Sequence, residues 1–105
     1  MEEYKKEDFD LIILGLCLQK KSVIATVTSS SKPEYFRPNY RKFASLVIAY
    51  YKKYKTIPTW AVLENHLKSK KVSLEMLLSF QKIFDDAMTV TVTENEFQFY
   101  YVFVS

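Results

Sequence analysis

The chain has 105 residues, enough for one domain, and 49% of them are hydrophobic while 26% are charged. This balance excludes general disorder and suits a single core that buries roughly 60 to 70% of the surface exposed by the unfolded chain. One Gly and three Pro are too few turn formers for a many-stranded sandwich or barrel, so the composition favours helices. The net charge of +3 permits an acidic partner without demanding one.

The cysteine content and the longest apolar block bear on location. A single cysteine, Cys17, cannot form an internal disulfide, and the first residues do not form a signal-peptide pattern. The apolar block at residues 11–18 is far shorter than the roughly twenty residues that span a bilayer. We therefore expect a soluble intracellular protein with no membrane partner.

The first expected helix begins near residue 7 or 8, where acidic side chains favour the positive end of the helix dipole, and ends at Gln19. It is apolar on most sides, as is typical of a central helix or one shared with a partner. Gly15 lowers helix stability by roughly 1 kcal/mol relative to Ala, which suggests close packing against another backbone. A short second helix then ends in the polar run 28–31, and its apolar residues are Val23, Ile24 and Val27.

Residues 35–67 contain the signals of a helical hairpin. Pro38 lies at the entrance of a long helix that should run to about Lys55, with Asn39 as its N-cap or a first-turn residue. Tyr35 and Phe36 are expected to pack a preceding turn against the core. Spacings of three and four place one set of residues on the core-facing side of the long helix, namely Tyr40, Phe43, Ala44, Val47, Tyr51 and Tyr54.

Two further helices are expected after the hairpin turn. Pro58 ends the long helix, since the residue before a proline avoids the α region, and Thr59 can cap the next helix. The buried face of that helix consists of Trp60, Leu63 and Leu67. Ser73 caps another helix that reaches about Ala87. The core candidates of this last helix are Leu74, Leu77, Leu78, Phe80 and Phe84.

Residues 89–104 are compatible with two structures. Their β-branched and aromatic residues favour a β-hairpin that turns at Glu94 and Asn95. The sequence from Thr93 to Glu96 is, however, a capping-box signature, and the following aromatic residues repeat at helical spacing. We favour a helix here, and so predict an all-α fold, a small bundle of about five to six helices forming a single domain over residues 1–105.

The order of these elements resembles the N-terminal domain of DnaB-family replicative DNA helicases, especially the phage-type proteins. The likeness rests on apolar positions and on one proline-marked turn. The residues that carry it are the apolar helix at 11–18, the Tyr35-Phe36 pair before the long helix, the turn Lys55-Thr56-Ile57-Pro58-Thr59, the helix at 60–67 and the terminal segment with Tyr100-Tyr101.

This resemblance implies a non-catalytic helical domain that forms a collar on a hexameric ring and docks primase or a helicase loader. It implies self-association, as a dimer or as a trimer of dimers within a hexamer, in the cytoplasm of a bacterial or phage-infected cell. The ATPase motor of the family is a separate domain, and one glycine leaves no Gly-x4-Gly-Lys-Ser/Thr phosphate-binding loop here. The chain would be a piece of a longer helicase or a free-standing relative. The helicase-binding domain at the C-terminus of primases shares the fold and is the alternative.

The residues suited to catalysis or metal binding are few. His66 is the only histidine and Cys17 the only cysteine, so a zinc site would need carboxylates to complete it. We interpret His66 as an ordinary helix residue and Cys17 as a core residue. The adjacent carboxylates Asp85 and Asp86 point in different directions on a helix, as solvated charges do. We expect no catalytic, cofactor or metal site, and an enzyme is the least supported class.

The terminal segment is the first candidate interaction surface. A helix there would carry two apolar stripes, and a small domain cannot easily bury both. One stripe is therefore expected to contact another subunit or the rest of a longer chain. The stripes consist of Phe97, Tyr100, Tyr101 and Val104 on one side and of Phe99 and Phe103 on the other.

The end of the long helix is the second candidate surface. Lys52, Lys53 and Lys55 alternate with tyrosines, a combination in which Lys neutralises phosphates and Tyr stacks on bases. We favour a simpler interpretation, in which Tyr51 and Tyr54 face the core and the lysines only solubilise the helix end. A small stand-alone DNA-binding protein is the remaining alternative, and weak or no direct DNA binding is expected.

Overall fold

The computed structural model describes residues 6–30 and 35–91, and these residues contain five α-helices and no strand. This confirms the predicted all-α class and helical bundle. The expected terminal helix lies outside the described residues. The five helices are α1 (Lys6–Gln19), α2 (Lys21–Ser30), α3 (Pro38–Tyr54), α4 (Trp60–Ser69) and α5 (Leu74–Met88).

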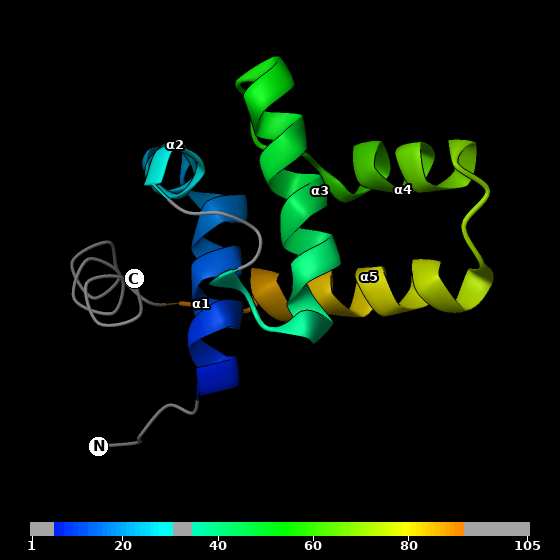
Figure 1. Cartoon of the computed structure of the whole chain (residues 1–105), viewed down its shortest axis with the longest axis horizontal. Helices are drawn as coiled ribbons and strands as arrows, with labels where there is room; N and C mark the ends of the chain where they lie inside the picture. The colour runs from blue at the N-terminus through cyan, green and yellow to red at the C-terminus, as the bar shows by residue number, and fades with distance from the viewer. Residues whose placement is uncertain (1–5, 31–34, 92–105) are drawn as a thin grey trace.

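The helices form two connected parts (Figure 1). In the first part, α1, α2 and α3 pack against one another. In the second, α4 and α5 form an extended hairpin that lies across the direction of α3. The C-terminal half of α5 returns to the first part, where it packs against α1. Among the described helices, the far end of the hairpin therefore consists of α4 and α5 alone. None of the described helices is long and apolar enough to cross a membrane.

The core is centred on α1, in agreement with its apolar character on most sides. Six apolar side chains of α1 are buried, and α2, α3 and α5 all contact this helix. Phe43 of α3 is fully buried and meets Phe80 of α5 edge to face, with ring centroids 5.9 Å apart. The buried residues of α1 are Ile12, Ile13, Leu14, Leu16, Cys17 and Leu18.

Gly15 allows α1 to approach the C-terminal end of α5 backbone to backbone. A Cβ at this position would lie 2.7 Å from the Val90 Cβ and would collide with the Ala87 carbonyl oxygen. One turn later, the Gln19 side-chain amide donates to the Val90 carbonyl oxygen at 3.0 Å and to that of Ala87 at 3.3 Å. Carbonyl groups at the end of α5 thus gain a donor from α1. The predicted close packing of Gly15 is confirmed.

The predicted helix ends are also confirmed. Pro38 is the first residue of α3, and Lys55, in the left-handed conformation at φ 58°, caps its C-terminus. The Thr59 and Ser73 hydroxyls accept from backbone N–H groups at the starts of α4 and α5. Asn39 lies in the first turn of α3, while the N-cap is Arg37. Local sequence signals therefore determine where these helices begin and end.

Four residues predicted to lie in the core are exposed. Leu74 and Leu78 are 69% and 54% exposed because the first half of α5 extends beyond the three-helix part and, among the described helices, α4 covers one side of it. Tyr54 is 53% exposed because it is the last residue of α3, whose final turn extends past the other helices. Tyr35 is 65% exposed, since only the second member of the Tyr35-Phe36 pair turns into the core.

Replacing Gly15 with Ala tests the contact between α1 and α5. Helix propensity alone would stabilise the protein by up to ~1 kcal/mol. The collision with the α5 backbone costs about 1 to 3 kcal/mol, as overpacking does in other cores, so we expect a net loss of stability. Thermal unfolding should show a midpoint lowered by several degrees. Ser45→Ala, on the exposed side of α3, should change stability by no more than about 0.5 kcal/mol. A stabilised Gly15→Ala protein would contradict the close approach.

Candidate functional site

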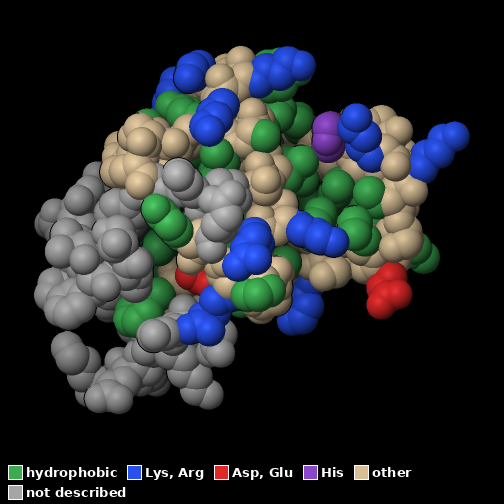
Figure 2. All heavy atoms as spheres, in the orientation of Figure 1, with side chains coloured by type: hydrophobic (Ala, Val, Ile, Leu, Met, Phe, Trp, Pro, Cys, Tyr) green, Lys and Arg blue, Asp and Glu red, His purple; other side chains and the backbone are tan. Residues whose placement is uncertain are grey.

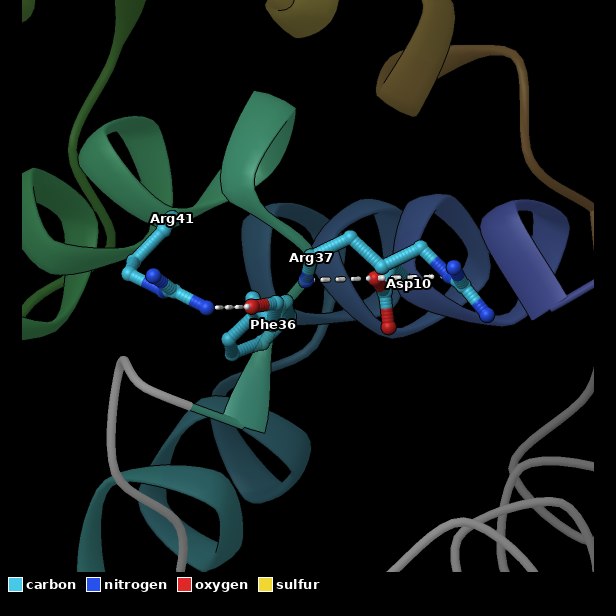
Figure 3. Close-up of polar contacts among 4 residues, drawn as sticks. All are labelled: Asp10, Phe36, Arg37 and Arg41. Carbon is cyan, nitrogen blue, oxygen red and sulfur yellow. Dashed lines mark hydrogen bonds and ion pairs between the residues drawn. The ribbon is translucent and has the colours of Figure 1, made fainter.

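A polar cluster joins α1 to the start of α3 (Figure 3). The buried Asp10 carboxylate accepts a hydrogen bond from the Arg37 backbone N–H at 2.9 Å and lies 4.0 Å from the Arg37 Nε. Arg41, one turn into α3, donates to the Phe36 carbonyl oxygen at 3.2 Å. Asp10 thus supplies from α1 an acceptor at the α3 N-terminus, where a negative charge is favourable. The cluster fixes the chain entering α3, which is a structural role.

Cys17 and His66 lie in unlike environments. The Cys17 side chain is buried in α1, which confirms its interpretation as a core residue. Burial raises the pKa of this thiol from 9.0 to about 12, so it is protonated at neutral pH. His66 lies on the exposed side of α4. Within residues 6–30 and 35–91, no group of three or more His, Cys, Asp and Glu is placed to hold a metal ion.

The lysines at the end of α3 lie beside a tyrosine pair in which Tyr54 is exposed and Tyr50 is half-buried. The Tyr50 and Tyr54 rings are tilted by 41°, with centroids 4.7 Å apart, and the Lys53 Nζ lies 5.3 Å from the Tyr54 ring. Tyr51 is buried as expected, with the Lys55 Nζ 5.8 Å from its ring. The expectation that Tyr54 also faces the core is wrong. Lys52, Lys53 and Lys55 are all exposed.

A second group of exposed lysines lies on the end of α4 and in the turn that follows. This group consists of Lys68, Lys70 and Lys71. Lys68 forms a 3.5 Å ion pair with Glu64, one turn earlier on α4. Figure 2 shows Lys and Arg side chains gathered over the C-terminal end of α3 and the far end of the α4–α5 hairpin.

Charge is segregated along the sequence, a signal that the overall charge of +3 conceals. Residues 37–71 contain nine of the fifteen Lys and Arg residues but one of the twelve acidic residues, Glu64, and so carry a net charge of +8. This count places Lys68, Lys70 and Lys71 in the same basic stretch of the sequence as the α3 lysines. The tertiary structure adds that these lysines are exposed and that Tyr54 is exposed with them.

The first half of α5 carries the exposed apolar surface of the hairpin. Leu74 and Leu78 are one helical turn apart and so share a face, which we call the α5 leucine face. The opposite side of α5 is covered, since Phe80 is buried and Phe84 meets Trp60 of α4 with ring centroids 5.7 Å apart. Leu74 and Leu78 are thus uncovered although the side of α5 that faces α3 and α4 is packed.

The predicted interface of the terminal segment lies outside the described residues. It comprises Phe97, Phe99, Tyr100, Tyr101, Phe103 and Val104. Comparisons of this chain with protein-family models, with curated proteins and with solved structures find no match. The resemblance to helicase N-terminal domains therefore rests on the order of elements and on the residues quoted for it above.

Replacing Asp10 tests the joint between α1 and α3. Asp10→Ala leaves the Arg37 N–H without this acceptor and should lower the free energy of unfolding by about 1 to 3 kcal/mol in urea denaturation. Asp10→Asn retains an acceptor oxygen and loses only the charge, so its effect should be smaller. Equal losses in the two variants would show that the hydrogen bond to Arg37 contributes little.

Because burial raises the pKa of the Cys17 thiol, we expect the stability of the protein to depend on pH. In the unfolded chain the thiol ionises near pH 9.0, whereas in the folded protein its pKa is about 12. Ionisation therefore favours the unfolded chain within this window, and stability falls as pH rises through it. From about pH 9 to about pH 10, wild type should lose up to ~1.4 kcal/mol more than Cys17→Ala, which has no thiol. The free energy of unfolding from urea denaturation is measured against pH for both proteins. An equal loss in the two proteins would contradict the raised pKa of the Cys17 thiol.

Proposed function

We propose that this chain is a non-catalytic assembly and protein-interaction domain of a phage-type replicative DNA helicase. In this role it would support hexamer formation and dock primase or a helicase loader. The observation that carries the interaction part is the α5 leucine face, formed by Leu74 and Leu78 at 69% and 54% exposure. The helicase assignment comes from the family resemblance, with which the all-α fold agrees.

The energetics of the leucine face favour a protein partner. Burying one leucine side chain contributes roughly 1.5 to 3 kcal/mol. Covering both residues of the face would therefore contribute several kcal/mol to association, before the entropy cost of binding. Their one-turn spacing is that of anchors on a helix that enters an apolar groove or pairs with another helix.

The shape of the domain makes this face accessible. The hairpin of α4 and α5 extends away from the three-helix part, and the leucine face lies on its outer half (Figure 1). Trp60 and Leu63 of α4 pack inward, so α5 keeps its position without a partner. A partner would thus meet a helix that is already ordered, which reduces the entropy cost of docking.

Self-association is proposed separately, through the terminal stripe that contains Phe99 and Phe103. Light scattering of the full chain over a concentration series should show a dimer or a larger assembly. Phe99→Glu combined with Phe103→Glu should shift it to the monomer, because two charges on an apolar contact oppose its burial. A wild-type chain that stays monomeric at every concentration would contradict the assembly role.

Docking of a partner is tested with the variant Leu74→Glu combined with Leu78→Glu. Purified primase and helicase loader from the same genome serve as ligands in isothermal titration calorimetry. We expect one of them to bind wild type and to bind the leucine variant at least about 100-fold more weakly, which corresponds to ~3 kcal/mol. Because both leucines are exposed, the variant should retain the wild-type circular dichroism spectrum.

A matched control carries the same two charges on another exposed helix surface. Ser45→Glu combined with Ala49→Glu places them one turn apart on the exposed side of α3, and binding should be retained. Equal loss in both variants would show a nonspecific effect of charge. Binding of neither ligand would overturn the docking proposal, and binding of a replicative helicase instead would favour the primase-domain alternative.

A further inference from the structure

We infer a second binding surface, for single-stranded nucleic acid, at the C-terminal end of α3 and the far end of α4. We call it the basic tyrosine surface. It is separate from the α5 leucine face and does not depend on the proposed helicase role. Its residues are Tyr50, Lys52, Lys53, Tyr54, Lys55, Lys68, Lys70 and Lys71.

The first argument is uncompensated positive charge. Residues 37–71 carry a net charge of +8, and no acidic residue occurs between Arg37 and Trp60. Among the lysines of this surface, Lys68 alone forms an ion pair within the described part of the chain, with Glu64. The negative end of the α3 dipole amounts to about half a charge, which three lysines outweigh. The surface thus attracts a polyanion, and phosphates bound there would release counterions.

The second argument is the aromatic pair formed by the exposed Tyr54 and the half-buried Tyr50. Lysines that only solubilise a helix end need no aromatic neighbour at the surface, yet Tyr54 is 53% exposed. Its ring is held against Tyr50 and lies beneath the Lys53 ammonium group. This arrangement pre-orders a ring on which a base can stack while the adjacent lysine reaches a phosphate. The expectation of a core-facing Tyr54, on which the simpler interpretation of these lysines depended, is therefore wrong.

The same ring decides which polyanion is favoured. In a duplex the bases stack on each other, so a protein ring reaches a base face only where the bases are unstacked, as in a single strand. An acidic protein would satisfy the lysines but would leave the tyrosine pair without a role. Single-stranded DNA or RNA uses both features, because its bases can stack on the ring while its phosphates meet the lysines.

The test measures binding of a fluorescent oligothymidine of about 16 nucleotides by anisotropy. Full-length wild type is titrated from about 50 to about 200 mM salt, with a duplex of equal length and a polyglutamate peptide as competitors. We expect tighter binding to the single strand than to the duplex and weak competition by polyglutamate. The affinity should fall steeply with salt.

Two sets of variants separate charge from stacking. Lys52→Ala combined with Lys53→Ala should weaken binding and reduce the slope of log affinity against log salt by about 1.4, or ~0.7 for each phosphate contact. Tyr54→Ala should weaken binding about tenfold with an unchanged slope, and Tyr54→Phe, which keeps the ring, should bind as wild type does.

The matched control removes two exposed lysines elsewhere. Lys20→Ala combined with Lys21→Ala alters the junction of α1 and α2, outside the basic segment, and should leave affinity and slope near wild type. The inference is overturned if the oligothymidine does not bind at low salt, or if it binds less tightly than the duplex. It is also overturned if the control variant weakens binding as much as Lys52→Ala combined with Lys53→Ala does. If polyglutamate competes as well as nucleic acid and Tyr54→Ala has no effect, an acidic protein is the favoured partner instead. Leu74→Glu combined with Leu78→Glu should not weaken oligonucleotide binding, so the two surfaces can fail independently.

Discussion

The contact of Gly15 with the end of α5 determines how the rest of the structure is arranged. A helix can approach another backbone this closely only where no Cβ intervenes, and the Gln19 amide then reaches the Ala87 and Val90 carbonyl oxygens. This contact fixes the C-terminal end of α5 against α1. Because α5 lies across the direction of α1 (Figure 1) and a helix rises about 1.5 Å per residue, the first half of α5 then lies away from α1.

That geometry explains the exposed leucines of α5. Phe80 is the buried aromatic residue of α5 and meets Phe43 of α3, while the residues before it lie in the part of α5 that extends beside α4. One helix covers one side of α5, so Leu74 and Leu78 on the other side stay in solvent. The exposure is a consequence of architecture, since both residues fit the apolar pattern of a buried face.

The two proposed surfaces differ in chemistry and in the elements that carry them. The leucine face is an apolar surface, on which affinity would come from burial. The basic tyrosine surface gathers charge at the end of α3 and at the end of α4, and its affinity would depend on salt. A domain with both could hold a protein and a single strand at once. This combination suits assembly on nucleic acid and requires no catalytic group.

The sequence by itself determined the helices and their ends. Pro38, Thr59 and Ser73 act on backbone groups within one turn, so their effect is local and could be predicted. The charge of residues 37–71 was equally present in the sequence. Only the tertiary structure decided which apolar residues are covered. Spacing places Tyr54 and Leu74 on a helical face, but whether another helix reaches that face depends on how far α3 and α5 extend beyond their neighbours.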